Sequence, residues 1–129
     1  MSIIVTDLDL ARLRTVLDHH DVPTAEALDA ELHRAVVVPQ REVPADVVTM
    51  NSDVVYEDES TGARRTVRVV YPRDADAGRG WVSVLAPIGS ALLGLRVGQH
   101  IDWNVPAGRR RLRIVEVPYQ PEAAGDLRA

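Results

Sequence analysis

The chain has 129 residues, of which 46% are hydrophobic, so it can form one domain, or one domain with a small appendage, around a modest core. It contains no cysteine and no lysine, which excludes disulfides, thiolate catalysis, Schiff-base chemistry and a phosphate-loop lysine. The net charge of −4 argues against sequence-independent DNA binding, which depends on the neutralisation of phosphates.

Acidic and basic residues are unevenly distributed along the chain. Residues 1–60 hold 13 acids and 4 arginines, whereas residues 61–129 hold 11 arginines and 6 acids. This asymmetry is typical of a protein with two functional faces, although a solvated surface also produces it. No apolar run approaches the roughly 20 residues that span a bilayer, and the N-terminus lacks the features of a secretion signal. We therefore expect a cytoplasmic protein that does not contact membranes.

Residues 1–38 are predicted to form a short antiparallel helical hairpin. After a short strand at residues 2–5, Thr6 is a suitable N-cap, and leucines recur at helical spacing until the sequence DHHDVP interrupts them. A second helix is predicted to begin with Thr24 as its cap. Its apolar stripe comprises Leu28, Leu32 and Val36. At 1.5 Å per residue each helix is only about 17–20 Å long.

The rest of the chain is predicted to be mostly β structure. Residues 39–46 contain two prolines and no periodicity, which indicates a linker. Residues 47–129 are predicted to form a curved antiparallel sheet with strands at residues 47–50, 53–58, 66–71, 81–85, 100–105 and 111–117. Trp103 and Val105 are expected to point inward and Asn104 outward. Turns are expected at residues 59–62 and 106–108, and a bulge near Val115.

One short helix interrupts the strands, at residues 87–93. Pro87 at its start and Gly94 directly after its end follow the residue preferences of helix termini. Leu92 and Leu93 are expected to fill the concave face of the sheet. A helical hairpin followed by a sheet wrapped around a one-turn helix defines the predicted fold class as α+β.

The loop between the two N-terminal helices carries Asp18, His19, His20 and Asp21. Imidazole and carboxylate groups are plausible metal ligands, but adjacent histidines in a tight loop rarely point the same way. An ordinary solvated loop is therefore favoured, and no metal or other cofactor is expected. Asp18 lies near a helix C-terminus, where a negative charge is unfavourable. Asp18 and Asp21 form either an acidic tip with a role or helix-end acids without one.

Arginines gather in the second half of the chain, at positions Arg64, Arg65, Arg68, Arg109, Arg110, Arg111 and Arg113. They could make a basic face for RNA, but their alternation with Leu112 and Ile114 indicates the solvated side of a sheet. Aromatic residues that could stack on bases are scarce. Contact with an acidic protein surface is expected in preference to RNA, and no sequence-specific nucleic-acid binding is expected. Trp81 and Trp103 are both expected to lie in the core.

Residues 86–119, APIGSALLGLRVGQHIDWNVPAGRRRLRIVEVPY, resemble the C-terminal domain of the bacterial Gre transcript-cleavage factors, whose core reads roughly S-P-L-G-R-A-L-L-G, then P-x-G, then I-V-E-I-x-Y. The segments MNSDVVYED, YQPEAAGDL, TDLDLARL and ALDAELHRA extend the resemblance to the Rnk family, named as regulators of nucleoside diphosphate kinase. The resemblance implies an FKBP-like domain at residues 47–129. It also implies binding to bacterial RNA polymerase at the rim of its secondary channel, in competition with Gre cleavage factors; we expect a monomer.

The resemblance implies that one loop contacts the polymerase, and this loop contains Ala86, Pro87, Ile88 and Ser90. The alternative is that these residues only build the turn. Gre factors place an acid and a serine before the proline, whereas this chain has Leu85 and Ala86. The serine N-cap of the short helix is therefore lost, at a cost of about 1 kcal/mol.

A second departure concerns the helical tip. Gre factors carry a D-x-x-E pair, within a D-L-x-E-N motif, at the tip of a long coiled coil, and such a pair can hold Mg²⁺ and assist RNA hydrolysis. Here Asp18 and Asp21 have a similar spacing without the motif, and the hairpin is too short. We therefore expect a non-enzymatic transcription regulator.

Two alternatives remain open. The first is an active Gre-type cleavage factor, which a transcript-cleavage assay would reveal. The second is an FKBP-like prolyl isomerase or chaperone. Fold alone is weak support for that activity, and the absence of phenylalanine is unfavourable because such a pocket is lined by aromatic side chains.

Overall fold

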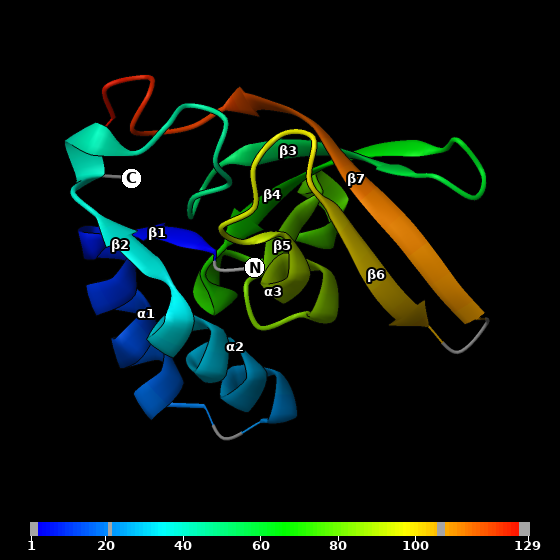
Figure 1. The fold of residues 1–129 in the computed structure, drawn as a ribbon. Coiled ribbons are helices and arrows are strands. Elements are labelled where there is room, and N and C mark those ends of the chain that lie inside the picture. Colours follow the sequence, from blue (N-terminus) through cyan, green and yellow to red (C-terminus); the bar gives the residue numbers. More distant parts are fainter. Residues whose placement is uncertain (1–2, 21, 106–107, 127–129) are drawn as a thin grey trace.

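A helical hairpin and two sheets make up the protein (Figure 1). The computed structural model describes residues 3–20, 22–105 and 108–126. In chain order the elements are β1 (Ile4–Thr6), α1 (Asp7–Asp18), α2 (Pro23–Arg34), β2 (Val36–Val38), η1 (Gln40–Glu42), β3 (Asp53–Asp58), β4 (Arg64–Val70), η2 (Pro72–Asp74), η3 (Ala77–Arg79), β5 (Trp81–Ser83), α3 (Pro87–Leu92), β6 (His100–Val105) and β7 (Gly108–Tyr119). The α+β class predicted from the sequence is confirmed. None of the helices in these ranges is long and apolar enough to cross a membrane.

Helix α1 begins and ends where the sequence predicts. Thr6 has extended backbone angles, and its hydroxyl accepts a hydrogen bond from the Asp9 amide at 3.0 Å. This bond satisfies one of the amides that the first turn of a helix leaves without a partner. The helix ends at Asp18, with His19 as its C-cap.

Helix α2 differs from the prediction at its start. It begins at Pro23 with Val22 as the N-cap, two residues before the Thr24 cap that the sequence suggests. Proline is well suited to the first position of a helix, because its fixed φ is helical and the missing N–H would have no partner there. The proline that ends the first helical pattern thus also begins the second helix.

The prediction was also wrong for the end of α2. The helix stops at Arg34, and residues 36–38 form β2, which pairs in parallel with β1. The Val36 amide donates to the Ile3 carbonyl at 2.8 Å. Val36 is 52% exposed and does not belong to the buried helical stripe. Consecutive β-branched residues favour this extended backbone.

The main sheet has five strands in the order β5-β4-β3-β7-β6. Its neighbouring strands are antiparallel except β4 and β5, which run parallel, so the expectation of a purely antiparallel sheet is wrong for this pair. Residues 47–50 were expected to be a strand, but only Val47 makes an isolated bridge, to Arg96. All four of these residues are nevertheless buried.

The pairing of β3 with β7 contains the predicted bulge. Val55 lies opposite Glu116 and Tyr56 lies opposite Ile114, so Val115 is left as the extra residue. A bulge of this kind bends a strand and increases its twist. The side-chain directions predicted for Trp103, Asn104 and Val105, and the turn at residues 106–108, lie outside what the structure describes.

One hydrophobic core joins the helical hairpin to the sheet. Its buried members include Leu13 of α1, Leu28 and Leu32 of α2, Val54 of β3, Ile114 of β7 and Leu92 of α3. Leu92 and Leu93 are 0% and 1% exposed, as expected for side chains that fill the concave side of the sheet. The hairpin is therefore packed against the sheet rather than projecting freely from it.

Gly94 brings the end of α3 into contact with the N-terminal strand. Its φ is +81°, and a Cβ added there would lie 2.5 Å from the Cβ of Ile3. The Gly94 amide donates to the Val48 carbonyl at 2.8 Å, and its carbonyl accepts from the Ile4 amide at 3.1 Å. Only glycine permits both the backbone angle and this close approach.

We predict that Gly94→Ala lowers the free energy of unfolding by about 2–4 kcal/mol, because it combines an unfavourable φ with overpacking against Ile3. Gly98→Ala is the matched control, since Gly98 has a φ of +90° with nothing within 4 Å of the added Cβ. The control should lose only about 1 kcal/mol. Urea denaturation measures both values, and equal losses would contradict a steric role for Gly94.

Candidate functional site

The predicted docking loop lies at the start of α3. Pro87 occupies the first helical position and is exposed, whereas Ala86, Ile88 and Ser90 are half-buried. Ala86 is the N-cap in extended conformation, and the described residues supply no side-chain hydrogen bond to cap this helix. The Ala86 carbonyl accepts a hydrogen bond from the Ser90 amide at 2.9 Å. Ile88 packs against the edge of the core. Only Pro87 is thus presented openly to a partner.

Ser83, the last residue of β5, holds this loop in place. Its carbonyl accepts from the Ala86 amide at 2.9 Å, and its hydroxyl accepts from the Leu85 amide at 3.1 Å. A Cβ added at Gly89 would lie 2.1 Å from the same carbonyl oxygen. The first turn of α3 therefore lies directly against the end of β5. Sequence reasoning did not identify Ser83 or Gly89, although a glycine within a one-turn helix was the available signal.

The predicted helical tip lies apart from this loop, at the turn between α1 and α2 (Figure 1). Asp18, His19 and His20 are exposed, and Asp21 lies outside the described residues. The imidazole Nδ1 of His19 donates to the Thr15 carbonyl at 2.8 Å, and that of His20 to the Val16 carbonyl at 2.8 Å. Both rings therefore complete hydrogen bonds of the last helical turn. Among the described residues no group of three potential ligands is placed to hold a metal ion.

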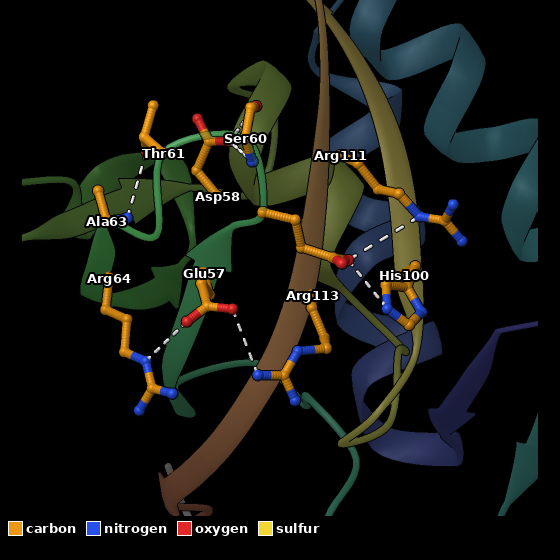
Figure 2. A network of polar contacts seen from close by, with 10 residues as sticks. Glu57, Asp58, Ser60, Thr61, Ala63, Arg64, His100, Arg111 and Arg113 are labelled. Carbon is orange, nitrogen blue, oxygen red and sulfur yellow. Dashed lines mark hydrogen bonds and ion pairs between the residues drawn. The ribbon is translucent and has the colours of Figure 1, made fainter.

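The arginines of the second half face acids of the same chain. Glu57 pairs with Arg64 at 3.1 Å and with Arg113 at 3.4 Å, as Figure 2 shows. Hydrogen bonds from Arg64 and Arg113 lower the pKa of Glu57. These pairs are exposed or half-buried, so each contributes little stability. They do reduce the positive potential that RNA would require.

The two neighbouring acids, Asp58 and Glu59, also form ion pairs with basic side chains. Asp58 pairs with Arg110, and hydrogen bonds from Ser60 and then Arg110 lower the pKa of Asp58. Glu59 lies 2.9 Å from Nε2 of His100 and 3.8 Å from Nε of Arg111. Three consecutive acids thus compensate the arginines of β7, which supports a solvated sheet face in preference to an RNA-binding one.

A row of interacting side chains crosses four strands of the main sheet. The Arg68 guanidinium lies between two aromatic rings, 5.2 Å from the centre of Trp81 and 5.3 Å from that of Tyr119. Asp53 accepts from it at 2.8 and 3.2 Å. Two cation–π contacts and a bidentate carboxylate hold this guanidinium in place. Trp81 is half-buried and is not part of the core, which corrects the prediction for this residue.

Three members of this row, Arg68, Trp81 and Tyr119, line a groove of about 980 Å³ beside α1. Its walls include Arg12 of α1, Asn51, Tyr71 and Arg73. Sequence reasoning missed this groove because its residues come from α1, three strands and the C-terminal segment. Both basic and acidic side chains line it, since Asp74 and Asp126 also contribute.

Asp9, in the first turn of α1, is a buried acid that sequence reasoning did not single out. It is 3% exposed, and its Oδ2 accepts a hydrogen bond from the Met50 amide at 3.1 Å. Burial, with a smaller effect of the nearby Glu122, raises the pKa of Asp9 from 3.8 to about 7, although the Met50 amide and Arg12 oppose the rise. Loss of hydration disfavours the charged carboxylate more than these partners favour it.

Comparisons with known proteins agree with this architecture. The family described as "Transcription elongation factor, GreA/GreB, C-term" matches residues 43–119. A solved structure described as "Prokaryotic transcription elongation factor GreA/GreB from Nitrosomonas europaea" superposes with a TM-score of 0.80 at 45% identity, covering 92% of this chain and 99% of that one. A crystal structure of GreA factor homolog 1 of Thermus thermophilus superposes with a TM-score of 0.51 at 25% identity, over 92% of this chain and all of that one. The protein is a Gre-related transcription factor.

The N-terminal part narrows the assignment. The family described as "Rnk N-terminus" matches residues 2–38. The "Regulator of nucleoside diphosphate kinase" of Escherichia coli (strain K12) is 46% identical over 129 aligned residues, covering 97% of this chain and 95% of that protein. The chain therefore belongs to the Rnk family. By contrast, the alignment with GreB of Xanthomonas axonopodis, at 36% identity, covers 71% of this chain and only 55% of that factor.

We predict that Gly89→Ala lowers the free energy of unfolding by about 2–3 kcal/mol, because a contact with a strand carbonyl cannot be relieved by side-chain motion. Alanine is favoured over glycine in helices by about 1 kcal/mol, so a net loss shows that the clash is the larger effect. Gly78→Ala is the control, since its added Cβ would meet only a side-chain oxygen at 3.4 Å. Thermal or urea unfolding measures the difference, and a Gly89 variant as stable as the control would contradict the close packing described here.

Proposed function

We propose that this protein is a non-enzymatic regulator that binds bacterial RNA polymerase at the rim of its secondary channel and competes there with Gre cleavage factors. Residues 86–90 make the contact, and the turn between α1 and α2 enters the mouth of the channel. The protein acts in the cytoplasm as a monomer, by occupancy rather than by chemistry. The alignment of nearly the whole chain with the Rnk relative and of residues 43–119 with the GreA/GreB family supports this proposal.

The presentation of Pro87 is the observation that carries the proposal. The side chain is exposed at the first turn of a helix whose far side is buried, through Gly89 and Leu92. The close approach of Gly89 to Ser83 fixes its orientation. A rigid, exposed apolar residue binds with little loss of conformational entropy, which is a common property of recognition loops.

The dimensions of the hairpin support regulation without cleavage. Each helix has 12 residues, so each is about 18 Å long at 1.5 Å per residue. Most of that length is occupied in packing against the sheet, because Leu13, Leu28 and Leu32 belong to the common core. The His19 and His20 rings at the tip form hydrogen bonds with their own helix. A tip that is this short and has its rings engaged in this way is poorly suited to hold Mg²⁺ deep in the polymerase.

We predict that Pro87→Asp weakens competition with a Gre factor for core RNA polymerase by about tenfold or more, because a charge must be desolvated in an apolar contact. The variant should remain folded, since aspartate is favourable in the first turn of a helix. Displacement of a fluorescently labelled Gre factor from the polymerase measures the effect.

Pro39→Asp is the matched control for that experiment. Pro39 is also exposed and also precedes a short helical turn, η1, but it lies outside the docking loop. This variant should compete like the wild type. Equal competition by both variants would exclude residues 86–90 as the contact.

We also predict that the protein leaves the transcripts of backtracked elongation complexes at full length and slows their shortening by an added Gre factor. The reason is that the tip lacks the D-L-x-E-N motif and the hairpin is too short to carry a metal-binding carboxylate pair into the polymerase active site. Gel analysis of end-labelled RNA measures both effects. Shortening by this protein alone would replace the proposed role with that of a cleavage factor.

A further inference from the structure

Asp9 lies where the helical hairpin meets the sheet. It belongs to the first turn of α1, and its Oδ2 accepts a hydrogen bond at 3.1 Å from the Met50 amide, in the segment that leads into β3. Its own amide donates to Thr6, so the residue is held on both sides. The side chains around this contact are largely apolar, with Leu13 and Met50 0% and 2% exposed. An acid in this position must be either neutral or charged within a medium of low polarity.

Three charged or titratable side chains face Asp9 from different elements. Arg12 lies one turn further along α1 and favours the carboxylate, whereas Glu122 in the C-terminal segment disfavours it. Tyr71, at the end of β4, is close enough to Asp9 for a charge there to raise the pKa of its hydroxyl. Glu122 is itself fixed, because its Oε1 accepts from the Thr49 hydroxyl at 2.6 Å. The junction thus contains two acids and one arginine beside the hydrogen bond that joins α1 to the segment before β3.

We propose that Asp9 is a proton-dependent latch that attaches the α1–α2 hairpin to the sheet, holding it firmly when the carboxyl is neutral and loosening it when the carboxyl ionises. The neutral acid fits the apolar junction and still accepts from the Met50 amide through its carbonyl oxygen. The ionised form loses its hydration and faces Glu122. A loosened hairpin exposes Asp9 to water. This restores the hydration of the carboxylate and weakens its repulsion by Glu122.

The direction of the pH effect follows from the pKa of Asp9. Burial raises it from 3.8 to about 7, so the attached hairpin binds the proton more strongly than the detached one. Attachment is therefore firmest at low pH. The equilibrium constant for attachment falls about tenfold for each pH unit above the pKa of the detached form. It becomes constant above about pH 7.

This inference does not depend on polymerase binding. If the proposed function holds as well, the latch sets how rigidly the tip is carried relative to the docking loop, because α2 and α3 pack against each other (Figure 1). A test on the isolated protein therefore fails or succeeds independently of any polymerase assay.

Hydrogen exchange measured by NMR between about pH 5 and about pH 8 provides the test, with rates corrected for the intrinsic effect of pH. In the wild type, the protection of α1 amides should fall about tenfold per pH unit up to about pH 7 and then become constant. Asp9→Asn should abolish this dependence, because the isosteric amide does not titrate. Asp7→Asn, at an exposed position of the same helical turn, is the control and should leave the dependence unchanged.

Glu122→Gln provides a second variant that keeps Asp9 in place. Removal of the nearby negative charge should move the pH at which protection levels off to a lower value. The protection of β7 amides should change much less than that of α1. An unchanged slope in Asp9→Asn, or an equal loss of protection in α1 and β7, would overturn the latch.

Discussion

The close contact of α3 with its neighbours is the constraint on which the rest of this structure depends. A helix of six residues is not stable alone. It is held because Leu92 and Leu93 are buried beneath the sheet and because glycines allow its backbone to touch β5 at one end and β1 at the other. The same contacts turn Pro87 outward. The packing that completes the core therefore also leaves Pro87 exposed at the surface.

The helical hairpin and the sheet depend on each other for the same reason. Leu13 and Leu28 reach the core that Leu92 and Ile114 also occupy, so neither half buries its apolar side chains without the other. The hairpin is consequently short and closely attached, which suits occupancy of a channel mouth and not reach into an active site. Glu57 and Asp58 of β3 pair with Arg113 and Arg110 of β7, so part of the positive charge of that strand is compensated.

Features set by neighbouring residues could be predicted from the sequence. The Thr6 cap, the start of α3 at Pro87 and the bulge at Val115 all follow from local backbone chemistry. Features set by the pairing of strands that are distant in the sequence could not be predicted in this way. The three valines of residues 36–38 favour an extended backbone, but their pairing becomes evident only when β1 is known to lie beside them. The parallel direction of β5 likewise depends on the path through η2 and η3. The role of Gly89 likewise becomes apparent only when the Ser83 carbonyl is placed against it.

The most direct measurement of the central claim is site-specific photo-crosslinking to core RNA polymerase. A photoreactive residue would be placed at position 87 on α3, at position 39 near η1 and at position 109 on β7, one at a time. Our interpretation predicts a crosslink from position 87 that disappears when an unlabelled Gre factor is added, and much weaker crosslinks from the other two positions. Crosslinks from position 109 or 39 with none from position 87 would contradict it.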